Sequence, residues 1–218
     1  MAKIVWDETG ARTYEAGVKN GVLYILDAQG AYSNGVAWNG LISVTESPSG
    51  AEATKLYADD MKYLELLSAE EFGATIEAYT YPVEFEACDG SASLGEGVTI
   101  GQQDRATFGL CYKTTVGNDV KGSEFGYKLH LIYGAKAKPS EKGYQTINDS
   151  PEAITFSWEV STTPVNVAGF KPTACVTIDS TKIAPDKLTQ IETLLYGDVS
   201  QEAKLPLPDE IAAIVTGE

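Results

Sequence analysis

The sequence predicts a mainly β protein, built as one large domain. Apolar and polar residues alternate with a period of two along most of the chain, as they do in half-buried strands of antiparallel sheets. A clear helical period occurs near the C-terminal end. With 218 residues, of which 43% are hydrophobic, the chain is long enough to bury a substantial core.

The first predicted strands lie before residue 70. Residues 21–27 form a short apolar run, and residues 35–47 alternate along one continuous strand. The Ser-Pro-Ser-Gly cluster at 47–50 follows, and then residues 51–68, whose Ala, Glu and Leu content also suits a helix. Because the cluster joins two runs of similar length, we expect a long hairpin with its turn at 47–50.

Four further strands are clearer, at residues 73–81, 106–116, 125–138 and 153–163. Each has apolar or aromatic residues on one face and polar residues on the other, which indicates one face packed on a core. Residues 174–179 are predicted to form a last short strand before the pattern changes.

The best helix is predicted over residues 184–197. Pro185 suits its first turn, and Gly197 suits its end. Its apolar face holds Leu188, Ile191, Leu194 and Leu195. We expect residues 1–200 to form the domain and residues 201–218 to form a C-terminal tail, in which 207–215 is a possible short helix with a frayed end.

Charge and hydropathy exclude several functions. The chain has 16 basic and 31 acidic residues, and a net charge of -15 argues against a surface that grips nucleic acid or an anionic membrane. No window approaches the roughly 18 uninterrupted apolar residues of a membrane span, and the first residues do not resemble a secretory signal. We therefore expect a soluble protein made in the cytoplasm.

Signals for cofactor or metal chemistry are weak. Cys88, Cys111 and Cys175 are an odd number of widely spaced cysteines, which indicates neither a disulfide framework nor a zinc site. Glycines at 95, 97 and 101 have the wrong spacing for a dinucleotide-binding fingerprint, so we expect a loop there. His130 is the only histidine and lies within a predicted strand. We expect no metal, no cofactor and no catalytic role for this histidine.

Two alternatives remain open on the residues alone. Close carboxylates at 59–60, 70–71 and 84–86 are compatible with a paired-acid glycosidase, although a solvated surface is the simpler interpretation. Trp38, Tyr79 and Tyr81, if exposed, are suited to stacking on sugars, which favours a carbohydrate-binding or adhesive β-sandwich module. The same residue types are enriched in subunit contacts.

The order of segments resembles one known family. The chain resembles the major tail proteins of long non-contractile-tailed bacteriophages (siphophages) of Gram-positive hosts. The similar stretches are 36–90, 101–119 and 127–165, together with the threonine-rich strand before the terminal helix. The resemblance covers roughly residues 20–200 and lies in long stretches of sequence. It implies a β-sandwich or barrel-like pair of sheets with one flanking helix and a long β-hairpin or loop.

The resemblance also implies a non-enzymatic structural role in the virion tail. Such subunits form homo-hexameric rings, and the rings stack into a tail tube that genomic DNA crosses without specific binding. The implied partners are other copies of the chain and the tape measure, distal tail and terminator proteins. A contractile or type VI secretion-like inner tube has a similar fold and stays an alternative, which would require a sheath partner.

Three groups of candidate residues follow from the resemblance. The hairpin around 47–60 is the candidate contact with the adjacent ring, through Ser47, Pro48, Ser49, Gly50, Glu52, Lys55, Tyr57, Asp59 and Asp60. Candidates for subunit contact or core are Tyr79, Tyr81, Pro82, Phe85 and Cys88. Glu77, on the polar face of its strand, is the candidate for the lumen, where carboxylates would repel DNA phosphates.

Overall fold

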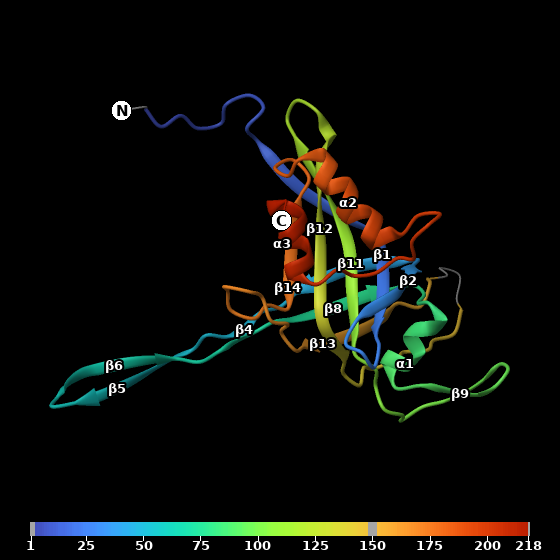
Figure 1. Ribbon diagram of the computed structural model, residues 1–218. Helices are drawn as coiled ribbons and strands as arrows, with labels where there is room; N and C mark the ends of the chain where they lie inside the picture. Colours follow the sequence, from blue (N-terminus) through green and yellow to red (C-terminus); the bar gives the residue numbers. More distant parts are fainter. Residues whose placement is uncertain (1–2, 148–151, 218) are drawn as a thin grey trace.

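The computed structural model describes residues 3–147 and 152–217, and most of its strands belong to one curved antiparallel sheet (Figure 1). The strands run in the order β2-β1-β11-β12-β13-β8-β3, and β14 pairs with β12 beside this path. Their bounds are β1 (Thr13–Leu26), β2 (Tyr32–Trp38), β3 (Leu41–Glu46), β8 (Gly73–Ala78), β11 (Phe108–Asn118), β12 (Gly122–Ala137), β13 (Phe156–Thr162) and β14 (Cys175–Asp179). The predicted mainly β class is confirmed.

The long strand β12 divides the sheet into two layers. Its residues 128–132 pair with β14, and its residues 135–137 pair with β13. Gly134 lies between these two stretches with φ +60°, and a Cβ there would lie 2.1 Å from the carbonyl oxygen of Thr163. Only glycine fits this position, so the change of partner depends on it.

The two layers enclose the larger core cluster. Its centre is aromatic: the ring centroid of Trp158 lies 5.0 Å from that of Phe85 and 5.8 Å from that of Trp38. The sheet curls far enough that β3 lies beside β1, although no ladder joins these two strands within the described residues. The result is a barrel-like sandwich with an unpaired seam between β1 and β3.

A second cluster packs helices on the outer face of β1, β11 and β12. Helix α2 (Pro185–Tyr196) matches the predicted helix, with Pro185 in its first turn and Gly197 at its C-cap. Helix α3 (Pro208–Thr216) confirms the possible helix in the tail. Buried members from the sheet and both helices include Tyr24, Leu129, Leu131, Tyr133, Leu188, Ile191, Leu195 and Ile211. The sheet is therefore flanked by two helices, where we expected one.

The predicted hairpin turn at 47–50 is wrong. Ser49–Gly50 form the short strand β4, which pairs with β7 (Glu70–Glu71). Residues 51–68 are themselves a hairpin of β5 (Ala53–Ala58) and β6 (Met61–Leu67), and its two-residue turn is Asp59–Asp60. Both aspartates have positive φ, 50° and 59°, as a type I′ turn requires. Aspartate is one of the few non-glycine residues that tolerate this conformation.

Two other expectations are corrected. The strand expected over 35–47 is broken at a turn at Asn39–Gly40, where the chain leaves β2, paired with β1, and enters β3, paired with β8. The loop expected around the glycines at 95–101 is a small hairpin of β9 (Ala92–Gly95) and β10 (Val98–Ile100). Between β8 and β9 lie a 3-10 turn, η1 (Val83–Phe85), and the short helix α1 (Glu86–Asp89), which the alternation did not predict.

Candidate assembly interface

The β5–β6 hairpin extends far from the body at the end of the β4/β7 pair, at the lower left of Figure 1. Its large apolar side chains face solvent, and the exposed fraction reaches 70% for Tyr57 and 72% for Leu67. The exposed set is Leu56, Tyr57, Met61, Tyr63, Leu66 and Leu67. An isolated two-stranded hairpin is marginally stable in water, and a cluster of exposed apolar side chains marks an interaction surface.

The two faces of the hairpin differ in polarity. On one face Leu56 is opposite Leu64, and Thr54 is opposite Leu66. On the other face the charged pair of Lys55 and Glu65 interrupts the apolar residues. We call Leu56, Leu64 and Leu66 the apolar hairpin face. A partner surface that covers it would remove three leucines from water.

Residues 47–52 and 68–73, which we call the stalk, connect the hairpin to the body. The Ser47 amide donates to the Gly73 carbonyl oxygen at 2.8 Å, and the Glu52 amide donates to the Ser68 hydroxyl at 3.0 Å. Gly50 has φ +85°, and a Cβ on it would lie 2.3 Å from the carbonyl oxygen of Ala69. The stalk pairing therefore requires glycine at this position.

All nine predicted inter-ring residues lie on this projection and are exposed, five in the stalk from Ser47 to Glu52 and four farther out. Their role in contact stays a prediction. Strand β6 was not among the predicted contact residues, yet its Met61, Tyr63, Leu66 and Leu67 supply most of the exposed apolar surface. The apolar residues of 61–67 were the available signal, but a buried strand has a similar composition.

The five residues predicted for subunit contact or core have different surroundings. Phe85 and Cys88 are fully buried in the larger core cluster. Tyr81 is half-buried and packs edge-on against Trp158, with ring centroids 5.4 Å apart. Pro82 is also half-buried, and Tyr79 is 55% exposed. Tyr79 is thus the member of this set with the most surface for a partner.

The outer face of β3, β8 and β13 is polar, and we call it the open face. Glu77 lies in its middle, half-buried, and its Oε2 accepts a hydrogen bond from the Ser43 hydroxyl at 2.8 Å. The strand register aligns hydroxyls and carboxylates around it: Ser43, Thr45, Thr75, Glu77, Ser157, Glu159 and Ser161. The alternate residues Ile76 and Trp158 point into the core. The predicted polar face of Glu77 is therefore present.

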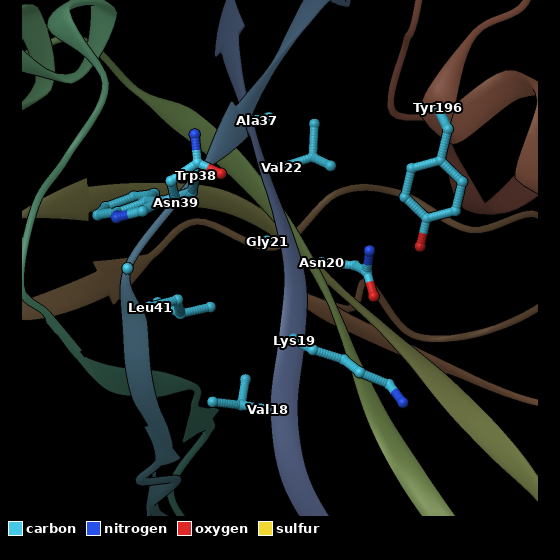
Figure 2. A pocket seen from close by; sticks show the side chains of 11 residues that line it. Val18, Lys19, Asn20, Gly21, Val22, Ala37, Trp38, Asn39, Leu41 and Tyr196 are labelled. Carbon is cyan, nitrogen blue, oxygen red and sulfur yellow. The ribbon is translucent and has the colours of Figure 1, made fainter. Parts of the chain in front are cut away.

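A pocket of about 430 Å³ lies where β1 meets the β2–β3 turn, opposite Tyr196 (Figure 2). Val18, Leu41 and Trp38 supply apolar surface, and Lys19 supplies its amine. Burial raises the pKa of Tyr196 above its ordinary value. None of the lining residues is a carboxylate, so this pocket does not provide the paired acids of a glycosidase.

One of the three aromatic residues proposed for sugar stacking is buried. Trp38 is only 3% exposed, and its indole N–H donates to the carbonyl oxygen of Thr80 at 3.0 Å. Its ring packs on Phe85 with centroids 4.6 Å apart. Trp38 therefore belongs to the core and has no free face for a sugar.

A second exposed apolar segment begins the described chain. Ile4, Val5 and Trp6 are 69%, 61% and 76% exposed. They belong to residues 3–9, which run away from the body at the upper left of Figure 1, whereas the Gly10 amide already donates to the Asp119 carboxylate. The sequence carries no clear signal for this N-terminal arm, because three apolar residues are too few to show a period.

Comparisons with known proteins add little. No protein-family model and no curated protein matches the chain. Among solved structures, the chain is similar to one from the extended sheath–tube complex of an extracellular contractile injection system, PVC. The TM-score is 0.31 at 11% sequence identity, over 73% of this chain and 88% of the other. Similarity at this level is not evidence for a shared function. None of the described helices is long and apolar enough to cross a membrane.

Proposed function

We propose that this protein is a non-enzymatic structural subunit that assembles with copies of itself into a tube. The projecting hairpin carries this proposal, because its exposed apolar side chains need a partner surface and the resemblance in sequence implies one on a neighbouring copy. A hairpin that docks on a different part of the next copy makes a head-to-tail contact. Contacts of this kind propagate into a ring or filament.

The polarity of the open face and the negative net charge of the chain suit the interior of such a tube. The open face carries hydroxyls and the carboxylates of Glu77 and Glu159. Its lysines are confined to the β12 edge, where Lys138 pairs with Glu159 and Lys136 lies opposite Ser161. A net charge of -15 per subunit also disfavours binding of DNA phosphates. We infer that the open face lines the lumen and that DNA passes along it without specific binding.

The finer assignment follows the resemblance. We propose a hexameric ring in the tail of a siphophage of a Gram-positive host, with tape measure, distal tail and terminator proteins as further partners. The inner tube of a contractile or type VI-like system is an equally good assignment on the present observations. Purified tubes mixed with candidate sheath proteins separate the two, since an inner tube binds its sheath and a siphophage tube has none.

Negative-stain electron microscopy tests the proposal. The wild-type protein, concentrated with and without added salt to screen its like charges, is expected to form rings or tubes with a stain-filled channel. A variant in which Gly-Ser-Gly replaces residues 53–67 is expected to stay folded and monomeric. A matched control replaces Leu94 and Val98, exposed on the separate β9–β10 hairpin, by serine and should still assemble.

Two results would contradict the proposal. If the wild-type protein is monomeric under every condition, self-assembly is contradicted. The carbohydrate-binding module is then the favoured alternative, and a glycan array tests it. Tubes formed by the hairpin-replaced variant would show that assembly does not use the hairpin.

A further inference from the structure

The only histidine of the chain lies at the seam between β1 and β3. The side chain of His130, 14% exposed, lies between carboxylates from these two strands. Its Nε2 is 3.3 Å from Oε1 of Glu15 in β1, and its Nδ1 is 3.6 Å from Oε1 of Glu46 in β3. Since no ladder joins β1 to β3 within the described residues, the imidazole bridges two strands that lack direct pairing.

The hydrogen bonds around the ring favour a proton on each nitrogen. The Thr114 hydroxyl donates its proton to Glu15 at 2.5 Å, so at 2.9 Å from Nε2 it can only accept from the ring. The Tyr112 hydroxyl donates to Oε1 of Glu46, which is the oxygen that faces Nδ1. Nδ1 is buried and has no hydrogen-bond partner at its present distance from that carboxylate. A proton there turns an unfavourable contact between lone pairs into an ion pair.

The other ionisable groups around the ring keep fixed charges while an imidazole titrates between about pH 5 and 8. The imidazole of His130 and the Tyr112 hydroxyl hold the pKa of Glu46 below its ordinary value. Burial raises the pKa of Glu15, but hydrogen bonds from Lys128 and Thr114 outweigh it and the pKa is lowered. Both carboxylates are therefore anionic over this range.

The remaining neighbours of His130 come from three strands. Lys128 of β12 pairs with Glu15, and hydrogen bonding to that carboxylate raises the pKa of its amine. Tyr112 of β11 stacks on the imidazole with centroids 4.7 Å apart, and burial raises the pKa of its phenol. Burial also raises the pKa of Cys175 in the adjoining β14. These groups do not change charge over this pH range.

One of the two carboxylates marks the root of the hairpin. Glu46 is the last residue of β3, and Ser47 begins the stalk of the hairpin. Glu15 is the third residue of β1, which pairs with β11 and holds its place in the body. A change in charge at His130 therefore acts where the hairpin leaves the body.

We propose that His130 is a proton-dependent clamp that fixes the hairpin root. The imidazolium, between Glu15 and Glu46, holds the end of β3 against β1, and loss of its proton loosens this end and the stalk that follows. The clamp acts in the single chain. Its consequence, that the pH sets how readily the hairpin is presented for docking, rests on the proposed function.

Hydrogen exchange of the monomer tests the clamp, with the Ser47 and Glu52 amides of the stalk as reporters. After correction for intrinsic rates, we expect these amides to exchange about fivefold more slowly near pH 5.5 than near pH 8, the effect of a partly buried ion pair. Because the chain has one histidine, its ring gives a single set of nuclear magnetic resonance signals, and the exchange midpoint should coincide with the titration of those signals.

Variants separate the clamp from a general effect of pH. His130→Gln and Glu46→Gln should each remove the pH dependence, whereas Glu210→Gln, which breaks an exposed pair with Lys204 at helix α3, should preserve it. Stalk exchange that does not depend on pH in the wild type, or dependence that persists in His130→Gln, would overturn the clamp. If a variant unfolds, the coincidence of the two midpoints in the wild type decides.

Electron microscopy at the same two pH values distinguishes the clamp from the proposed function. Tubes that form more readily at one pH, together with a pH-dependent stalk, support both. A pH-dependent stalk without tubes at either pH supports the clamp and contradicts the proposed function.

Discussion

Gly50 faces the carbonyl oxygen of Ala69 so closely that a Cβ at position 50 would lie 2.3 Å from it. The glycine also has φ +85°, a conformation that side chains strongly disfavour. The pairing of Ser49–Gly50 with Glu70–Glu71 depends on this approach. The orientation of the hairpin relative to the body therefore depends on Gly50 of the stalk.

Substituting Gly50→Ala should loosen the hairpin and leave the body intact. The Cβ must displace backbone, so we expect proteolysis within residues 47–73 to become about tenfold faster, the equivalent of roughly 1.4 kcal/mol at the stalk. Limited proteolysis with mass spectrometry measures this. Gly97→Ala is the matched control, because Gly97 also has positive φ but nothing within 4 Å of its Cβ position. Equal cleavage of the 47–73 segment in both variants would contradict the argument.

Replacing Asp89→Ala should destabilise the body. The buried Asp89 carboxylate accepts a hydrogen bond from the Trp158 indole at 3.1 Å and pairs with Lys142. Removing it leaves the indole N–H unpaired in the core, and we expect the free energy of unfolding to fall by about 2–3 kcal/mol in urea titrations. Asp89→Asn keeps an acceptor for the indole and should cost less.

The exposed Glu84 is a control for the Asp89 result, since Glu84→Ala in the same segment should change the free energy of unfolding by less than about 0.5 kcal/mol. A loss for Asp89→Ala no larger than that of the control would mean that the buried carboxylate does not stabilise the fold.

Thiol labelling should distinguish the cysteines by burial. Burial raises the pKa of Cys88 and of Cys111 to about 12 in each case, so almost no thiolate is present near pH 8. Cys175 is half-buried. With iodoacetamide near pH 8 we expect Cys175 to be labelled first, and the other two only after unfolding in guanidinium chloride. Labelling of folded Cys88 as fast as that of Cys175 would show that the core is open.

The sequence predicted helix α2 to within a residue, because three signals agree there. The apolar period, Pro185 in the first turn and Gly197 at the end all specify the same segment. The central strands were also found from alternation, since one face of each packs on the core. The short helix α1 was missed because four residues are too few to show a helical period.

The hairpin shows what local sequence signals cannot resolve. Ser-Pro-Ser-Gly has the composition of a turn, yet the chain passes through it as the stalk and turns at Asp59–Asp60. Composition ranks glycine and proline as turn residues above a pair of aspartates. The exposure of the hairpin was not predictable either, because a buried strand can contain the same leucines as β6. The candidate contact segment was located, but its apolar surface was not.

Photo-crosslinking from position 57 tests the central claim, self-assembly through the hairpin, most directly. A photoreactive phenylalanine derivative replaces Tyr57, which is 70% exposed on the hairpin, and the protein is irradiated over a range of concentrations. The proposal predicts covalent dimers and higher oligomers in which residue 57 of one copy is joined to the body of another, with a yield that rises as rings or tubes form. Products confined to the monomer at every concentration, or tubes without any crosslink from position 57, would contradict it.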